Sequence, residues 1–244
     1  MKTPKVLLYG NPIGGYGDKF NRIAKLHSMK DYLLRKMDDF QKAGAVTHRT
    51  KCALAVKMMM LTGIRIGNES SAEGYVSKRS DAMGRTIQTY GLTTLNKKHF
   101  TFRNGLCYVT FVGKREVKQT YKIGDAKLIA QIKRVMGATT DSETMLGLSD
   151  YELRKFIAKS VGNKFCAKDF RTLYANVMAS DIHARICKEP LPNTKTEANA
   201  EIKTICEYVA EQLGNTPGVC KRSYIDSGLI DYHLELRYFK PKQK

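Results

Sequence analysis

Residues 99–123 read HFTFRNGLCYVTFVGKREVKQTYKI. Short β-favouring runs alternate here with turn signals, and the Asn104-Gly105 pair is a strong signal for a tight hairpin turn. Gly-Lys-Arg at 113–115 leads into the last run. The stretch therefore predicts a small antiparallel sheet of about three strands, with Lys114 on a hairpin tip. A further β-favouring run, TTL at 93–95, extends this region toward the N-terminus.

Helical patterns precede the sheet region. Apolar residues recur at helical spacing from about residue 18 to 44, and a second helix is predicted from about 47 to 63. The second helix contains ALAVKMMMLTGI (53–64), an apolar stretch with a lysine inside. This stretch is shorter than the roughly 20 residues that cross a membrane. It therefore predicts a buried helix.

Helices also follow the sheet region. Asp125 and Ser149 are typical helix N-caps, and a long helix is predicted over about 168–187. Pro190 and Pro192 then interrupt the chain. Together the elements predict an α+β fold that is mainly α-helical, with a small three-stranded antiparallel sheet.

The C-terminal part begins with a helix that Thr196 opens and Gly214 ends. Thr216-Pro217 resembles an N-cap followed by proline at the first helical position. A final helix is predicted from there, with Tyr224 about two turns into it. Tyr224 could be a core aromatic, a surface residue or a nucleophile, and its own surroundings do not decide between them.

The composition allows one large domain or two modest ones, since the chain has 244 residues of which 42% are hydrophobic. Its 42 Lys and Arg against 23 Asp and Glu leave a net charge of +19. Such an excess attracts polyanions. Nucleic acid is the first candidate partner and an anionic membrane surface the second. A generically basic protein is the alternative that needs no partner.

The six cysteines are scattered, without a C-x-x-C pair or a cluster with histidine, which argues against a structural zinc site and a disulfide framework. Reduced thiols fit a cytosolic or nuclear compartment. The apolar run within residues 1–12 is too short for a signal peptide. GNPIGGYG (10–17) lacks the Gly-Lys-Ser/Thr of a phosphate-binding loop and predicts a flexible entry loop. KPKQK (240–244) predicts a disordered basic tail.

Three cations stand in unusual surroundings. Arg65 lies between isoleucines in TGIRIGN, Arg171 has aromatic neighbours in KDFRTLY, and Lys114 follows an apolar run in FVGKREV. A basic residue in an apolar frame needs an anionic partner, either a buried carboxylate or a ligand phosphate. Each cation taken singly is more often structural than functional.

Taken together with Tyr224, these cations match a pattern. The motifs TGIRIGN, YGLTTLNKKHF, FVGK, KDFRT and LGNTPGVCKRSYI occur in the order of type IB DNA topoisomerases of the small poxvirus and bacterial kind, which the chain resembles from about residue 18 onward. The resemblance implies the shared tyrosine recombinase and topoisomerase IB catalytic fold over residues 18–240. It leaves residues 1–17 as an N-terminal segment.

The resemblance also implies a role for each matching residue. Arg65 and Arg171 would hold the non-bridging oxygens of the scissile phosphate, and Asn215 would donate a hydrogen bond to one of them. Lys114 would protonate the leaving 5′ oxygen. Tyr224 would attack the phosphorus and become linked to the 3′ end of the DNA.

Further basic residues are expected around this constellation. Lys168 would assist the proton transfer as an auxiliary. Additional contacts to the DNA are expected from Lys97, Lys98, Arg115, Lys221 and Arg222.

These roles are chemically consistent with one another. A phenol with a pKa of about 10 is a poor nucleophile at neutral pH, so its site must be strongly cationic. Guanidinium groups match phosphate geometry and stay charged. One phosphodiester is exchanged for another, so the resemblance implies no ATP, no metal and no other cofactor. It implies double-stranded DNA as the partner, a monomeric enzyme, and a cytoplasmic location or, for a viral protein, the virion or nucleus.

Two alternatives stay open. Tyrosine recombinases share the fold and the tyrosine chemistry, although they usually carry His-x-x-Arg where this chain has Lys168-Asp-Phe-Arg171. A non-catalytic DNA-binding protein would explain the charge but not the constellation. The N-terminus departs from the family, whose members normally carry a small β domain ahead of the catalytic one. Residues 1–17 are too few for that domain, which suggests a piece of a longer protein or a reduced enzyme.

Overall fold

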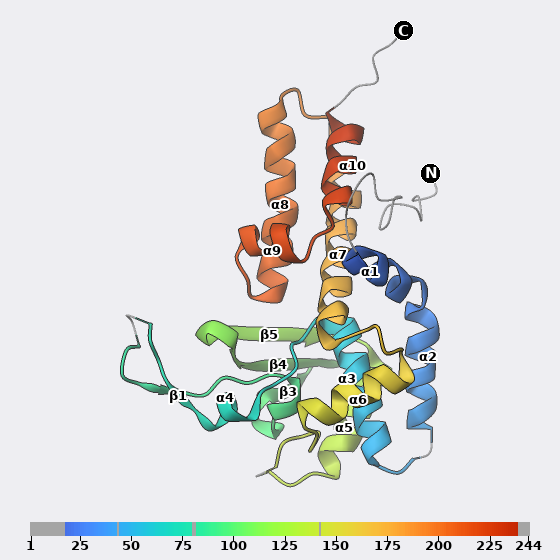
Figure 1. Cartoon of the computed structure of the whole chain (residues 1–244), viewed down its shortest axis with the longest axis vertical. Coiled ribbons are helices and arrows are strands. Elements are labelled where there is room, and N and C mark those ends of the chain that lie inside the picture. Colours follow the sequence, from blue (N-terminus) through green and yellow to red (C-terminus); the bar gives the residue numbers. More distant parts are fainter. Residues whose placement is uncertain (1–17, 43, 80–81, 142, 239–244) are drawn as a thin grey trace. The chain divides into compact units, whose positions relative to one another are not determined.

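The computed structural model describes residues 18–42, 44–79, 82–141 and 143–238. These residues are mainly helical and include a small three-stranded antiparallel sheet, as the sequence predicts (Figure 1). The predicted entry loop at 10–17 and the basic tail at 240–244 lie outside the described residues. The chain divides into two compact units. Unit 2 comprises residues 29–171, and the described part of unit 1 comprises 18–28 and 172–238.

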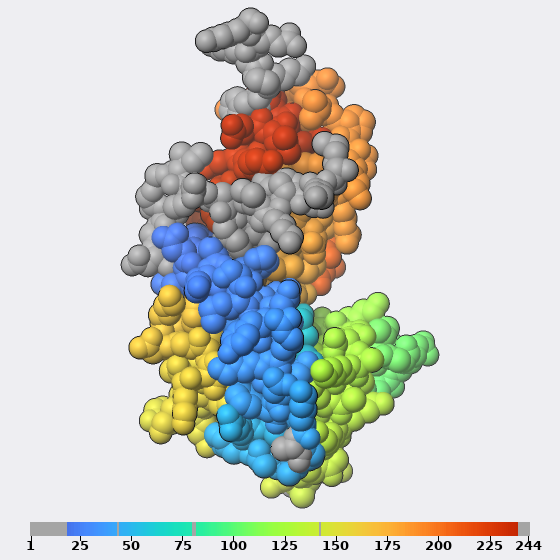
Figure 2. Space-filling model, turned by 90° about the vertical axis from the view of Figure 1, so that its right-hand side faces the viewer, coloured from blue at the N-terminus to red at the C-terminus, as the bar shows by residue number. Residues whose placement is uncertain are grey.

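Unit 2 is built around α3 (His48–Thr62), which is buried along nearly its whole length. It contacts α2 (Lys30–Gln41), α5 (Ala126–Gly137) and α6 (Asp150–Ser160) (Figure 1). In Figure 2 the blue surface of α2 separates the yellow surface around α6 from the green surface of the sheet and α5. A helix that is apolar on all sides belongs in a core. The predicted buried helix is therefore confirmed.

The prediction of one continuous helix over residues 18–44 is wrong. The chain forms α1 (Asp18–Ser28) and α2, separated at Met29. Both helices keep the apolar spacing seen in the sequence and bury apolar side chains, Ile23 and Leu26 in α1 and Leu33 and Met37 in α2. However, α1 belongs to unit 1 and α2 to unit 2. Periodicity alone shows only that each segment has an apolar side. It does not show that the two segments belong to different units.

The predicted sheet is confirmed. It consists of β3 (Phe100–Arg103), β4 (Leu106–Gly113) and β5 (Val117–Ile123), with β4 in the middle. The Asn104-Gly105 turn has φ angles of 50° and 72°, which the hairpin turn of type I′ requires. Side chains of one face are buried, namely Phe100, Cys107, Val109, Phe111, Tyr121 and Ile123.

Lys114 lies at the tip of the second hairpin, in the short helix η3 (Lys114–Glu116). The TTL run is not a strand: η1 (Leu92–Thr94) is helical, because the Thr94 hydroxyl bonds back to Gly91. Short elements that the sequence did not indicate complete the unit. They are α4 (Glu69–Glu73), β1 (Tyr75–Val76), β2 (Thr86–Ile87) and η2 (Lys97–His99).

The lysine inside α3 is buried and paired. Lys57 is only 3% exposed, and its ammonium lies 2.9 Å from Asp38 and 3.8 Å from Asp125. Gln131 and Lys127 also bond to the Asp38 carboxylate. Burial raises the pKa of Asp38, but hydrogen bonds from Lys57, Gln131 and Lys127 outweigh burial and hold the pKa below its usual value. A charge in the core is thus neutralised where α2, α3 and α5 meet.

We expect Asp38→Ala to lower the free energy of unfolding by about 3 kcal/mol, because it leaves the Lys57 ammonium buried without its closest partner. Adding Lys57→Met should recover most of this loss, since the charge is then gone as well. Urea unfolding followed by circular dichroism measures both changes. Asp39→Ala is the matched control, because Asp39 pairs with Lys42 at the surface. A double variant no better than Asp38→Ala would contradict the interpretation.

Unit 1 contains α1, most of α7 (Ala167–Ile186), α8 (Lys195–Leu213), α9 (Pro217–Ser223) and α10 (Ser227–Arg237). The long helix predicted over 168–187 is α7. The core of unit 1 is formed by apolar side chains from α7 to α10, including Ala175, Ala179, Ile202, Ile205, Val209, Leu213, Ile225 and Leu229.

The predicted start of α8 is two residues too late. Thr194, not Thr196, is the N-cap, and its hydroxyl accepts from the Glu197 amide. The Glu197 carboxylate in turn accepts from the Asn193 amide, so this side chain fixes the first turn from the other side. The predicted end at Gly214 is confirmed, with φ of 55°.

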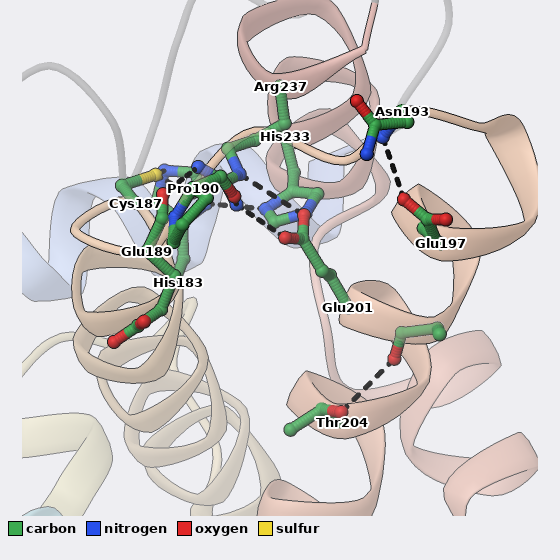
Figure 3. Close-up of polar contacts among 11 residues, drawn as sticks. His183, Cys187, Glu189, Pro190, Asn193, Glu197, Glu201, Thr204, His233 and Arg237 are labelled. Atoms are coloured by element: carbon green, nitrogen blue, oxygen red, sulfur yellow. Dashed lines mark hydrogen bonds and ion pairs between the residues drawn. The ribbon is translucent and has the colours of Figure 1, made fainter.

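A chain of buried polar groups ties α10 to α7 and α8 (Figure 3). His233 Nε2 lies 3.0 Å from a Glu201 oxygen, and His233 Nδ1 lies 2.9 Å from His183 Nδ1. Arg237 donates to the same Glu201 carboxylate, and Cys187 Sγ lies 3.5 Å from His183 Nε2. Because the carboxylate can only accept, His233 donates through Nε2 and accepts at Nδ1. His183 then donates through Nδ1 and accepts from the Cys187 thiol.

Both histidines are neutral in this arrangement. Burial lowers the pKa of His183 to about 4, and the positive charge of Arg237 acts in the same direction. Burial also lowers the pKa of His233, although Glu201 opposes it.

This chain of groups predicts an acid-sensitive stability. Below about pH 6.5 the unfolded chain binds protons that the folded His183 excludes, so the free energy of unfolding should fall as the pH drops from about 6.5 toward 4. Each excluded proton contributes a slope of at most about 1.4 kcal/mol per pH unit. Urea unfolding at several pH values should give a shallower slope for His183→Gln than for the parent. His48→Gln, at an exposed histidine, is the control. Equal slopes for His183→Gln and the parent would refute this.

Candidate active site

The loop that carries Arg65 follows directly from the end of α3. Gly63 ends the helix with φ of 65°, a left-handed conformation that glycine adopts without strain. Two residues later, the Arg65 carbonyl accepts a hydrogen bond of 2.8 Å from the Leu92 amide. Arg65 is half-buried. The motif TGIRIGN is therefore fixed against the motif YGLTTLNKKHF through their backbones.

Two glycines make this contact possible. A Cβ atom on Gly91 would lie 2.7 Å from the Gly67 Cα, and one on Gly67 would lie 2.7 Å from the Thr93 hydroxyl. The Gly67 amide donates to that hydroxyl at 3.1 Å. Glycine is needed at both positions because the two backbones touch. The sequence pattern contained these residues but did not reveal that their role is to hold the Arg65 loop.

The same backbone network reaches the hairpin of Lys114. The Tyr90 amide donates to the Val112 carbonyl at 2.8 Å, which ties YGLTTLNKKHF to FVGK. Lys114 itself is exposed, two residues beyond Val112. A Cβ atom on Gly113 would lie 2.9 Å from Gln119 Cγ, so the turn before Lys114 packs closely on β5.

Arg171 joins the network from the first turns of α7. Its side chain is 2% exposed, and its Nη1 donates to the Gly63 carbonyl at 2.6 Å and to the Tyr121 hydroxyl at 3.5 Å. Asp169 accepts from the Cys166 amide at 3.0 Å and so fixes the start of the helix. Lys168 is exposed in the same turn. Four predicted motifs thus meet within unit 2, where Gly63 links the segments of Arg65 and Arg171.

Tyr224 and Asn215 belong to unit 1. The prediction that Tyr224 lies two turns into a final helix is wrong. Tyr224 is the residue after α9, with φ of −129°, and α10 begins only after the Asp226 N-cap. The Tyr224 amide still bonds to the Cys220 carbonyl at 3.0 Å, and the residue is buried. The chain turns here because Asp226 caps a separate helix through the Gly228 amide.

Two residues that the sequence did not indicate fix the backbone around Tyr224. Asn176 of α7 is 1% exposed, and its amide group donates to the Tyr224 carbonyl and accepts from the Asp226 amide, both at 2.8 Å. Lys19 of α1 donates to the Ser223 carbonyl at 2.5 Å. A single asparagine in a helical pattern gives no sign of such contacts.

Asn215 lies between two helix ends. Its backbone amide donates to the Ala210 carbonyl at 2.9 Å, directly after the left-handed Gly214. This is the arrangement of a Schellman motif. Thr216 caps α9 through the Val219 amide, and Pro217 is its first residue, as predicted. The capping role belongs to Thr216, so Asn215 is not the cap of α9.

The other predicted DNA contacts differ in their surroundings. Lys97 is paired with Asp141 at 3.0 Å, and the Lys98 ammonium lies 5.7 Å from the centre of the Tyr90 ring. Arg115 is exposed beside Lys114 and has a φ of 65°. Lys221 and Arg222 are exposed on α9.

Other kinds of site receive no support from the described part of the chain. Within it, no group of three or more His, Cys, Asp or Glu residues is placed to hold a metal ion. None of its helices is long and apolar enough to cross a membrane. A hollow of about 170 Å³ beside the Arg65 loop is lined in part by Glu69 and Asp150, and these carboxylates disfavour an anion there.

Comparisons with known proteins agree with the motif arrangement. The family described as eukaryotic DNA topoisomerase I, catalytic core, matches residues 17–243. DNA topoisomerase 1B of Acanthamoeba polyphaga mimivirus is 26% identical over 202 residues, which cover 78% of this chain and 55% of that protein. The chain thus spans about half the length of this relative. Because the family match covers nearly the whole chain, the chain belongs to the type IB DNA topoisomerase family, whose catalytic core it matches.

Proposed function

We propose that this chain relaxes supercoiled DNA by cutting and resealing one strand through a 3′-phosphotyrosyl linkage. The observation that carries the proposal is the meeting of four motifs in unit 2, where the Gly63 carbonyl links the segments of Arg65 and Arg171. Family membership supports the same activity. The net charge of +19 suits a DNA substrate.

Arg65 and Arg171 bind the non-bridging oxygens of the scissile phosphate in this proposal. Their planar, permanently charged groups match two phosphate oxygens and stabilise the charge that builds up on them. The Gly63 carbonyl and the Tyr121 hydroxyl are neutral acceptors. These two bonds orient the Arg171 guanidinium without cancelling its charge. Asn215 adds a neutral donor to a phosphate oxygen.

Tyr224 attacks the phosphorus, and the 5′ oxygen leaves. The phenol gives its proton to water, while Lys114 supplies a proton to the leaving alkoxide, assisted by Lys168. Proton transfer of this kind contributes about 10²–10⁴-fold to a rate. One phosphodiester bond forms as another breaks, so the strand can be resealed without an external energy source.

We expect the protein to relax negatively supercoiled plasmid in EDTA without ATP, and Tyr224→Phe to abolish relaxation. The variant should still bind DNA in a gel shift, because only the nucleophilic hydroxyl is lost. Denaturing gels with strands labelled at the 3′ or the 5′ end identify the linkage. Tyr151→Phe, at a tyrosine that is 68% exposed in unit 2, is the matched control and should relax DNA normally.

Each other result points to a different function. Site-dependent strand exchange would indicate a recombinase, and a gel shift without relaxation would indicate a DNA-binding protein. A covalent adduct formed by Tyr224→Phe, or attachment through a 5′ phosphate, would exclude the role proposed for Tyr224.

The role of Lys114 has a separate test. Lys114→Ala should slow cleavage of ordinary DNA by about 10²-fold or more, because the leaving alkoxide loses its proton donor. A substrate with sulfur in place of the 5′ bridging oxygen has a leaving group that needs no proton, so the defect should nearly vanish. Single-turnover cleavage of the two substrates gives the comparison. Lys118→Ala, at an exposed lysine of the same hairpin, should cleave both normally. An equal defect on both substrates would reject the general-acid role.

A further inference from the structure

Strand β5 places two polar side chains on the buried face of the sheet. Lys118, Thr120 and Lys122 are exposed, whereas Gln119 and Tyr121 are 5% and 6% exposed. Burying an amide or a hydroxyl costs free energy unless it is hydrogen-bonded. An apolar residue would fill either position at a lower free-energy cost. The presence of two polar groups here therefore points to a role for their hydrogen bonds.

Their contacts lead to Arg171. The Tyr121 hydroxyl donates to the side-chain oxygen Oε1 of Gln119 at 3.1 Å. Having given its proton to Gln119, the hydroxyl presents its lone pairs to Arg171 Nη1, which donates to it at 3.5 Å. The ring of Tyr121 stacks on Phe111, with 6.0 Å between the ring centres, so Phe111 supports the ring that carries the hydroxyl.

Gln119 also touches the hairpin that carries Lys114. A Cβ atom on Gly113 would lie only 2.9 Å from Gln119 Cγ, so the Gln119 side chain packs against Gly113. The same side chain therefore packs beneath the residue before Lys114 and accepts the hydroxyl that faces Arg171. Gln119 thus joins the support of Lys114 to that of Arg171.

We propose that Gln119 and Tyr121 are positioning residues for the cleavage reaction. Tyr121 holds the Arg171 guanidinium in the orientation that the phosphate requires, and Gln119 orients the Tyr121 hydroxyl. Neither touches the reacting atoms. The proposal rests on the proposed function, because it assigns a role to residues that act through Arg171.

Tyr121→Phe is the sharpest test, since it removes only the hydroxyl and leaves the ring to stack on Phe111. Single-turnover cleavage of a DNA duplex at saturating protein should slow on the order of tenfold, less than the hundredfold that a 1 Å misplacement can cost. DNA affinity should stay at its parent value, and the urea midpoint should fall only modestly, because the buried Gln119 side chain loses its donor. Tyr108→Phe, at a half-buried tyrosine on the opposite face of the sheet, is the matched control and should cleave at the parent rate.

A second variant tests the pairing. Gln119→Met keeps the volume but removes the acceptor, so it should slow cleavage by a similar factor. The double variant should be no slower than Tyr121→Phe alone, because both changes remove one interaction with Arg171.

The outcomes separate this inference from the proposed function. A parent protein that forms no covalent adduct would refute the proposed function itself. If the parent forms the adduct and Tyr121→Phe cleaves at the same rate, the positioning role is wrong. A Tyr121→Phe variant whose DNA affinity falls in step with its rate would show a structural role only. Defects that multiply in the double variant would show that the two residues do not act as a pair.

Discussion

The burial of α3 is the constraint on which unit 2 depends. Because this helix is apolar on all sides, α2, α5, α6 and the sheet must cover it. A buried helix also leaves its last carbonyl groups without helical partners. At the end of α3, the Gly63 carbonyl is satisfied by Arg171, and the chain turns into the loop of Arg65. The packing of the core around α3 therefore also places the segments that carry Arg65 and Arg171.

The candidate site is fixed largely through backbone groups. Arg65 and Val112 accept from amides of the YGLTTLNKKHF segment, and Gly67 and Gly91 allow two chains to touch. Backbone contacts of this kind leave side chains available for a ligand. They also explain why motifs far apart in the sequence contain glycine and threonine beside the charged residues.

In unit 1, Tyr224 lies between two helices, α9 and α10, and not inside either of them. A residue between two helices has fewer backbone hydrogen bonds than one inside a helix. Asn176 and Lys19 supply them on both sides of Tyr224. The buried chain from His183 to Arg237 then anchors α10, the helix that follows. The position of Tyr224 thus depends on α1, α7 and α10 as much as on its own motif.

The sequence by itself determined many of the local elements. The Asn104-Gly105 turn, the caps at Asp125, Ser149 and Thr216, and the helix end at Gly214 follow from short-range rules of backbone conformation. Each motif that indicated the family is also a short run of consecutive residues, so the motifs and their order can be recognised before the fold is known.

Only the tertiary structure decided the rest. The break at Met29, the place of Tyr224 outside α9, and the partners of Lys57 and Asn176 all depend on residues far away in the sequence. Side-chain periodicity records that a group is buried, but not which distant group it meets. That choice is made when the cores pack, because a buried charge or amide must find a partner wherever the fold supplies one.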